Sequence, residues 1–289
     1  MTKRFMILRK ADADTEAGIM PGEPLLAAMG EYNEGLVKAG VMRAGEGLQP
    51  TSKGARVSFR AGKAHVTDGP FTEAKELVAG FTMIEVESKQ AAIDWVKRWP
   101  PLDGHGEVEI EIRELGCPAG MAGHSEAATP APARHADGTP LLRYMVLLKA
   151  CDATEAGYLT DDQHLAKMTQ RNLESVSAGM MIGGEGLQPS NRGARVKFSG
   201  GKPKVIDGPF AEAKELIAGF WMLQVRSKQE AIDWVKSYPF PLGDEAEVEI
   251  RKVFEAADFG EAFTPELREA EERLREHIGQ SGMPLTAKP

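Results

Sequence analysis

The chain has 289 residues, 42% of them hydrophobic and 27% charged, which is ordinary for about two soluble globular domains. A formal net charge of -8 leaves no basic field for nucleic acid or an anionic membrane, so both are excluded as main partners. No apolar run is long enough to span a bilayer, and the first ten residues resemble a strand rather than a signal peptide, which predicts a cytoplasmic protein.

The two cysteines, Cys117 and Cys151, are too few for a disulfide framework, and neither has a Cys or His at metal-ligand spacing. The glycines do not form a phosphate-binding pattern, and no motif indicates a calcium loop or a covalent nucleophile. The sequence therefore predicts neither a metal nor a cofactor.

The sequence repeats itself at an offset of 139 residues. Roughly two thirds of the positions in 40–100 are identical to those in 179–239. The closing strand, Glu107 to Ile110, is matched with Glu247 to Ile250 at an offset of 140, so the preceding loop absorbs one residue. Four segments follow: copy one (1–115), an Ala/Pro/Gly-rich flexible linker (116–140), copy two (141–254) and a C-terminal tail (255–289). Each copy is long enough to bury its own core.

Strands and helices alternate within each copy. In copy one we expect a strand at 5–8, a helix at 25–39, hairpin strands at 55–59 and 65–66, a strand at 81–86, a helix at 90–97 and a strand at 108–112. Copy two repeats this order, with its first strand at 144–148 and its first helix at 161–178. Gly40 and Gly179 are expected to end the first helices, and Ser88 to cap the second helix of copy one.

This order is that of a ferredoxin-like βαββαβ unit of the α+β class, in which one antiparallel sheet carries both helices on one face. The other face of each sheet would expose apolar strand residues, and the chain contains a nearly identical second sheet that can cover them. We therefore predict that the two copies pack face to face as an intramolecular pseudo-dimer.

The tail contains a predicted helix that starts with Thr264 as N-cap and Pro265 at the first helical position. Leu267, Ala270, Leu274 and Ile278 form one apolar stripe along it. We expect this stripe to pack on the body of the protein. The alternative is a docking helix for another protein.

The segments Asp68 to Leu77 and Asp207 to Leu216, each followed by a Gly-Phe pair, resemble the signature of the DGPF domain family in the YCII-related group. The resemblance covers both copies nearly end to end. It implies ferredoxin-like units that form dimeric α/β barrels, and an association with extracytoplasmic-function sigma factors. It implies no particular reaction. Some relatives use a His with an Asp, but copy one has Leu25 where copy two has His164.

Repeated carboxylates are the candidate catalytic groups, because a carboxyl near other carboxylates or apolar walls has a raised pKa suited to acid–base work. They are Asp68, Glu73, Glu76, Asp207, Glu212 and Glu215. The candidate ligand-binding residues are Glu46, Gln49, Arg56, Lys75, Glu185, Gln188, Arg195 and Lys214. Other roles stay open, since Asp68 and Asp207 suit a turn, and the charges from Glu73 to Glu76 could form an ion pair that holds the loop.

Two functions remain open. The first is binding of an unknown small molecule, or general acid–base catalysis, in two related clefts that contain the repeated loops. The alternative is a regulatory protein that docks on a partner, such as an extracytoplasmic-function sigma factor, through the C-terminal helix. Further oligomerisation of the pseudo-dimer is compatible with both.

Overall fold

The computed structural model describes residues 2–71, 77–116, 124–125, 138–158, 160–211, 215–242 and 246–280, with backbone only at 124, 125 and 280. Among the helices in these ranges, none combines the length and the apolar character that crossing a membrane requires.

Copy one contains six strands and three helices in the described residues. They are β1 (Lys3–Lys10), α1 (Ala13–Glu16), α2 (Glu23–Lys38), β2 (Met42–Gly47), β3 (Ala55–Arg60), β4 (Lys63–Asp68), β5 (Val78–Val86), α3 (Lys89–Val96) and β6 (Glu109–Glu114). The two-residue strand β7 (His124–Ser125) lies between the copies.

Copy two and the tail repeat the pattern and add one helix. The elements are β8 (Leu142–Lys149), α4 (Asp152–Glu155), α5 (Asp162–Ser177), β9 (Met181–Gly186), β10 (Ala194–Ser199), β11 (Lys202–Asp207), β12 (Ile217–Val225), α6 (Lys228–Ser237), β13 (Glu247–Lys252) and α7 (Pro265–Gln280).

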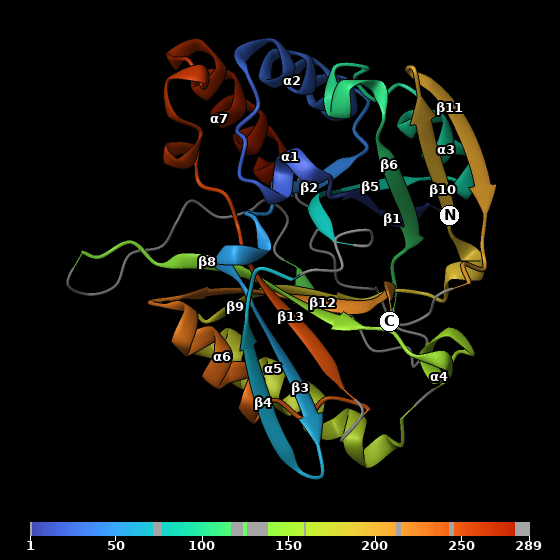
Figure 1. Ribbon diagram of the computed structural model, residues 1–289. Helices are drawn as coiled ribbons and strands as arrows, with labels where there is room; N and C mark the ends of the chain where they lie inside the picture. Colours follow the sequence, from blue (N-terminus) through green and yellow to red (C-terminus); the bar gives the residue numbers. More distant parts are fainter. Residues whose placement is uncertain are drawn as a thin grey trace.

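The molecule is built of four layers, helices on the outside and two antiparallel sheets facing each other in the middle (Figure 1). Helices α2 and α3 cover the outer face of one sheet, and α5 and α6 cover that of the other. Between the sheets lies a shared apolar core to which both copies contribute, including Met6, Phe81, Met145 and Phe220. The predicted α+β fold and the face-to-face pseudo-dimer are confirmed.

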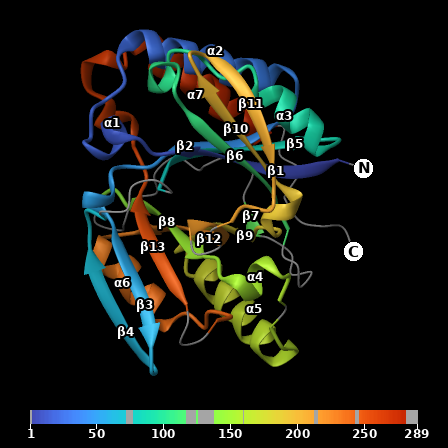
Figure 2. The ribbon, with the colours of Figure 1, turned by 45° about the vertical axis from the view of Figure 1, so that its right-hand side comes forward.

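Each sheet also contains a hairpin from the other copy. The first sheet has the strand order β11-β10-β6-β1-β5-β2, and the second has β4-β3-β13-β8-β12-β9-β7. The copy-two hairpin β10–β11 therefore extends the copy-one sheet, and β3–β4 extends the copy-two sheet (Figure 2). Ala55 and Val57 are part of the core under α6, while Val196 and Phe198 are part of the core under α3. The expectation that each copy buries its own core is wrong.

The closing strands correct the sequence alignment. In copy one Leu8 pairs with Glu111, and at the equivalent place in copy two Leu147 pairs with Glu249. Glu111 thus corresponds to Glu249, an offset of 138 rather than 140. Side chains alternate between the faces of a strand with a period of two, so a two-residue slip preserves the inward and outward pattern and cannot be detected from it.

Local sequence signals were mostly sufficient to predict where the helices begin and end. Gly40 and Gly179 follow α2 and α5 with φ of 70° and 67°, and Ser88 accepts a hydrogen bond from the Ala91 N–H at 3.1 Å. Gly45 to Gly47 belong to strand β2, which pairs with β5 and is not among the strands expected from the sequence. The linker is described only at its ends and at β7, which pairs with β9, so the prediction of flexibility falls mainly outside the described residues.

Candidate functional site

The central strand of each sheet carries the same row of side chains on the face that meets the other sheet. On β1 the row is Arg4, Met6, Leu8 and Lys10, and on β8 it is Arg143, Met145, Leu147 and Lys149. The methionines and leucines form the core between the sheets. The cations stand at the two ends of each row, and the two lysines belong to two groups of buried charged side chains, here called ionic clusters.

The first ionic cluster consists of Lys10, Glu111, Arg113, Glu155 and Arg195. Glu111 is completely buried and accepts Lys10 Nζ at 3.1 Å, Arg113 Nη1 at 3.2 Å and Arg195 Nη2 at 2.9 Å. Arg113 Nη2 reaches Glu155 Oε1 at 3.3 Å. Since Arg195 and Glu155 belong to copy two and the others to copy one, the cluster forms only when both copies are folded together.

The second ionic cluster is the pseudo-symmetric counterpart and consists of Lys149, Glu249, Arg251, Glu16 and Arg56. Glu249 accepts Arg251 Nη1 at 2.9 Å and Arg56 Nη2 at 3.3 Å, and Arg251 Nη2 lies 3.4 Å from Glu16. The Nζ of Lys149 lies 3.9 Å from Glu249 Oε2, beyond hydrogen-bond distance. The lysine is therefore held less closely here than in the first cluster.

Burial and charge act in opposite directions on the titration of these groups. Burial favours the neutral form of Glu111, but Lys10, Arg113 and Arg195 outweigh it and lower the pKa of Glu111 to about 2. The pKa of Glu249 is likewise lowered by its cations against the effect of burial. Burial lowers the pKa of Lys149, an effect that Glu249 opposes and Arg56 and Lys10 strengthen.

Both clusters contain a buried guanidinium nitrogen to which no described residue offers a hydrogen-bond acceptor. Arg113 Nε and Arg251 Nε have no hydrogen-bond acceptor among the described residues, although each side chain is at most 1% exposed. Their Nη2 atoms do find acceptors, the backbone carbonyls of Gln188 and Gln49, at 2.7 and 2.8 Å. A buried polar atom that is unpaired in both halves indicates a place for a water molecule or a polar ligand.

The DGPF loops border these clusters. The Phe71 N–H donates to Thr51 Oγ1 at 3.1 Å, and Thr51 donates in turn to Glu16 of the second cluster. The Phe210 N–H donates in the same way to Ser190 Oγ, and the Ser190 N–H to Glu155 of the first cluster. The loop backbone is thereby tied to the buried charges.

One further contact holds each loop. The Arg56 guanidinium lies over the Phe71 ring at 4.2 Å, and Arg195 lies over Phe210 at 4.3 Å. The peptide bonds before Pro70 and Pro209 are both cis. A Cβ on Gly69 would lie 1.9 Å from the Thr51 carbonyl oxygen, so only glycine fits at this position.

The structure places the predicted site residues in several different parts of the molecule. Arg56 and Arg195 belong to the clusters, as described above. Asp68 and Asp207 are mostly exposed and pair with lysines at the starts of α6 and α3, Asp68 with Lys228 at 2.7 Å and Asp207 with Lys89 at 2.8 Å. These pairs link the exchanged hairpins to the other copy, and a catalytic role for either Asp stays a prediction.

Glu46 and Glu185 pair with Arg143 and Arg4, the arginines at the other ends of the two rows, and belong to neither cluster. Glu185 forms a bidentate pair with Arg4, yet burial raises its pKa above the ordinary value. Glu46 pairs with Arg143 at 2.7 Å and with Arg275 of α7 at 2.9 Å. These two arginines outweigh burial and lower the pKa of Glu46. The two equivalent carboxyl groups therefore differ because only Glu46 meets the tail helix.

Gln49 and Gln188 contribute backbone carbonyls to the clusters, while their side chains turn away, to Asp258 at 2.9 Å and to the Gly116 carbonyl at 3.0 Å. Glu215 is half-buried. The remaining predicted residues lie outside the described part of the chain: Glu73, Lys75, Glu76, Glu212 and Lys214.

The lysines, Glu111, Glu249, Arg113 and Arg251 were missed by sequence reasoning. The sequence did contain a signal for them. The segments Glu-Ile-Glu-Ile-Arg and Glu-Val-Glu-Ile-Arg occur at the same place in the two copies, and each puts its carboxylates and its arginine on the same face of a strand. In the structure this is the face covered by the second sheet.

Two further observations bear on the predicted ligands and partners. The described residues contain no group of three or more Cys, His, Asp or Glu side chains arranged to hold a metal ion. Helix α7 begins after Thr264 as predicted, and its apolar stripe packs against α2, with Ile278 buried. Docking of a partner on this helix stays a prediction.

Similarity to an individual curated protein indicates no activity, because the matching relative is itself uncharacterized. An uncharacterized protein of Rhizobium meliloti (strain 1021) is 32% identical over 76 residues, which is 26% of this chain and 61% of that protein. This chain therefore spans about three fifths of that relative's length.

Two solved structures are similar at low scores. An anthrone oxidase-like protein has 8% identity and a TM-score of 0.31, over 88% of this chain and 91% of that one. A mutant chlorite dismutase from Candidatus Nitrospira defluvii has 8% identity and a TM-score of 0.36, over 97% and 94%. Neither value supports an argument about function.

The family assignment rests on the two copies themselves. The sequence profile of the YCII-related domain matches residues 3–115 and again residues 142–256, most of the chain. These two matches contain the duplicated clusters and the DGPF loops described above. The chain therefore belongs to the YCII-related family, as a tandem protein with two YCII-related domains.

Proposed function

We propose that the protein binds a small anionic molecule, such as a dicarboxylate, at its two ionic clusters, and that Lys149 acts there as a general base. The observation that carries the proposal is a pair of buried guanidinium groups that each keep an unused donor. Arg113 and Arg251 are completely buried, and the Nε of neither has a hydrogen-bond acceptor among the described residues. Lys149 lies in the same cluster as Arg251, with its Nζ 3.9 Å from the Glu249 carboxylate that Arg251 also contacts.

Burying charged groups is costly, and two changes can reduce that cost at this site. One is deprotonation of a lysine, and the lowered pKa of Lys149 favours this. The other is binding of an anion, for which guanidinium groups are the preferred partners in proteins. The unpaired Nε atoms of Arg113 and Arg251 provide donors that no described acceptor uses.

These two changes are coupled. An anion bound near Lys149 stabilises its ammonium form, so binding takes up a proton at a pH above the lowered pKa of Lys149. Where the ligand binds as its neutral acid, the proton comes from the ligand instead of the solvent, and this transfer to the neutral amine of Lys149 is general base chemistry. The proposal thus assigns a binding role to the arginines and a proton-transfer role to Lys149.

The test uses oxalate, malonate and inorganic phosphate as probes of the full chain. An anion at 100 times its dissociation constant adds about 2.7 kcal/mol to the free energy of unfolding, which is visible as a higher melting temperature. Calorimetry in buffers of different ionisation enthalpy then measures the proton taken up. We expect uptake in the wild type and none in Lys149→Met.

Lys228→Met is the matched control, because Lys228 lies outside the clusters and pairs with exposed Asp68. It should retain the binding and the proton uptake of the wild type. An absence of stabilisation by all three anions would contradict the binding role. Equal proton uptake in the wild type and in Lys149→Met would contradict the role of Lys149 alone.

A further inference from the structure

A buried position between sheet and helices carries different side chains in the two copies. Trp221 of β12 corresponds to Thr82 of β5, because the flanking residues Phe220 and Phe81 occupy equivalent places on the paired central strands. The Trp221 ring packs in copy two with its centroid 4.9 Å from that of Tyr238, and its Cδ1 lies 3.1 Å from where a Cβ on Gly184 would stand. Copy one has no indole over the equivalent glycine, Gly45.

The hydrogen-bond partner of this indole is also present in both copies. In copy two Asn172 Oδ1 accepts the Trp221 Nε1–H at 3.2 Å and the Tyr238 hydroxyl at 2.8 Å. The corresponding oxygen in copy one, Asn33 Oδ1, is buried and has no donor among the described residues. Trp99, which replaces Tyr238, donates instead to Asp103 at 2.8 Å. Copy one therefore keeps the acceptor but lacks both donors.

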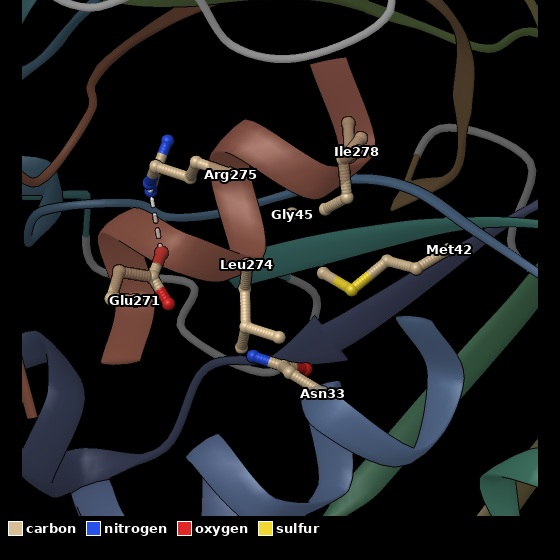
Figure 3. A pocket seen from close by; sticks show the side chains of 8 residues that line it. Asn33, Met42, Gly45, Glu271, Leu274, Arg275 and Ile278 are labelled. Atoms are coloured by element: carbon tan, nitrogen blue, oxygen red, sulfur yellow. Dashed lines mark hydrogen bonds and ion pairs between the residues drawn. The ribbon is translucent and has the colours of Figure 1, made fainter. Parts of the chain in front are cut away.

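A small cavity marks the same place. Residues from two parts of the chain line it (Figure 3). The body of copy one contributes Asn33, Met42, Ala44 and Gly45, and helix α7 contributes Glu271, Leu274, Arg275 and Ile278. The free volume is about 20 Å³, enough for one water molecule. Leu274 and Ile278 thus cover on the outside a space that a tryptophan fills from the inside in copy two.

Helix α7 is a cover with a limited attachment. Its apolar stripe meets α2 and β2, but only Ile278 in it is fully buried. The pair between Arg275 and Glu46 adds one anchor, and Glu46 keeps Arg143 as a partner without it. Withdrawal of α7 therefore leaves no buried charge alone.

We propose that α7 is a removable cover over a ligand site in copy one, and that this site takes a planar aromatic molecule with an N–H donor, of which indole is the simplest. The ring would lie against Gly45, and its N–H would donate to Asn33 Oδ1, as Trp221 does within copy two. Leu274 and Ile278 move away to admit it. The site is on the helix side of the sheet, opposite the ionic clusters, so it is independent of the proposed anion site.

The first experiment needs no variant. Indole is titrated into the full chain labelled with ¹⁵N, and the side-chain amide signals of Asn33 and Asn172 are followed. The expected result is a shift of Asn33 with Asn172 unchanged. A shift of neither signal, in the wild type and in a variant with a weakened cover, would overturn the proposal.

Variants then test the cover and the contact by calorimetry. Ile278→Ala weakens the docking of α7 and should bind indole about tenfold more tightly, because less binding free energy is spent on opening the cover. Leu173→Ala, at an exposed leucine of α5, is the matched control and should bind like the wild type. Equal affinity in Ile278→Ala and the wild type would overturn the role of α7.

Two further variants test the ligand chemistry. Thr82→Trp supplies the indole from the protein and should abolish binding, whereas unchanged binding would place the ligand elsewhere. Asn33→Leu should weaken indole about tenfold, the effect of one lost hydrogen bond, and should affect naphthalene, which has no N–H, far less. Equal losses for the two molecules would overturn the contact with Asn33.

Discussion

Lys149 Nζ lies 3.9 Å from Glu249 Oε2, whereas the equivalent Lys10 Nζ lies 3.1 Å from Glu111 Oε2. The duplicated chain thus places the same lysine in two different electrostatic settings. The looser pair leaves burial as the dominant influence on Lys149, whose pKa is lowered. This difference distinguishes the two otherwise similar clusters.

Lys149→Met should change the pH dependence of stability. Between the lowered pKa of folded Lys149 and the ordinary lysine value near 10.4, the unfolded chain holds more protons, so wild-type stability rises with pH. The variant lacks this rise. The free energy of unfolding of Lys149→Met minus that of the wild type, from urea denaturation, should therefore decrease as pH increases through this window. A difference independent of pH would show that Lys149 titrates normally.

Glu111→Gln should be strongly destabilising at neutral pH, by about 3–5 kcal/mol, because it leaves three cations around a neutral amide. The pKa of Glu111 is lowered to about 2, so its stabilising effect is full above the unfolded value near 4.3 and is lost as pH falls toward 2. The gap between wild type and variant should narrow over that range.

Glu109→Gln is the control for this measurement. Glu109 is partly exposed and lies 3.5 Å from Arg195, so its removal should cost no more than about 1 kcal/mol. If Glu111→Gln lowered the free energy of unfolding by as little as Glu109→Gln, the carboxylate of Glu111 would not be what holds the buried cluster together.

Gly69→Ala should destabilise the protein and displace the DGPF loop, because its Cβ would meet the Thr51 carbonyl at 1.9 Å. Gly30→Ala is matched to it in chemistry, since Gly30 lies within α2 with open space around it. It should stabilise the protein by about 0.5–1 kcal/mol through lower unfolded-state entropy. Thermal unfolding of both variants tests this prediction. The change in melting temperature relative to the wild type must be negative for Gly69→Ala and positive for Gly30→Ala.

Separate expression of the two copies should give no stable monomers. Without the other copy, β6 and β13 lose their hairpin neighbours, and the core between the sheets is exposed. We expect each copy to self-associate or aggregate, and a mixture to form a one-to-one complex. Size-exclusion chromatography with light scattering is the measurement, and two well-behaved monomers that ignore each other would contradict the exchanged fold.

Part of the architecture could be predicted from sequence because its causes are local. Gly40 and Gly179 have the positive φ that a helix end requires, and Ser88 caps α3 through its own side chain. The repeat supplied the second sheet, and apolar strand faces required a cover, so the packing of the two sheets could be expected as well.

The hairpin exchange could not be predicted, because its two possible partners are nearly the same. β3 could pair with β6 or with β13, whose sequences differ in few residues, and the structure has β13. The same similarity hid the two-residue shift in the alignment. The ionic clusters were missed for this reason, since Arg56 meets Glu249 only through the exchange.

The sequence by itself determined the duplication, the class of fold, the helix caps and the place of the DGPF loops, since each depends on residues that are near in the chain or repeated in it. The tertiary structure alone decided which copy each hairpin completes and which charges meet inside the molecule. The physical reason is that strand pairing is specified by the alternation of side chains, which two almost identical partners satisfy equally well, and the choice between them depends on the geometry of the whole chain.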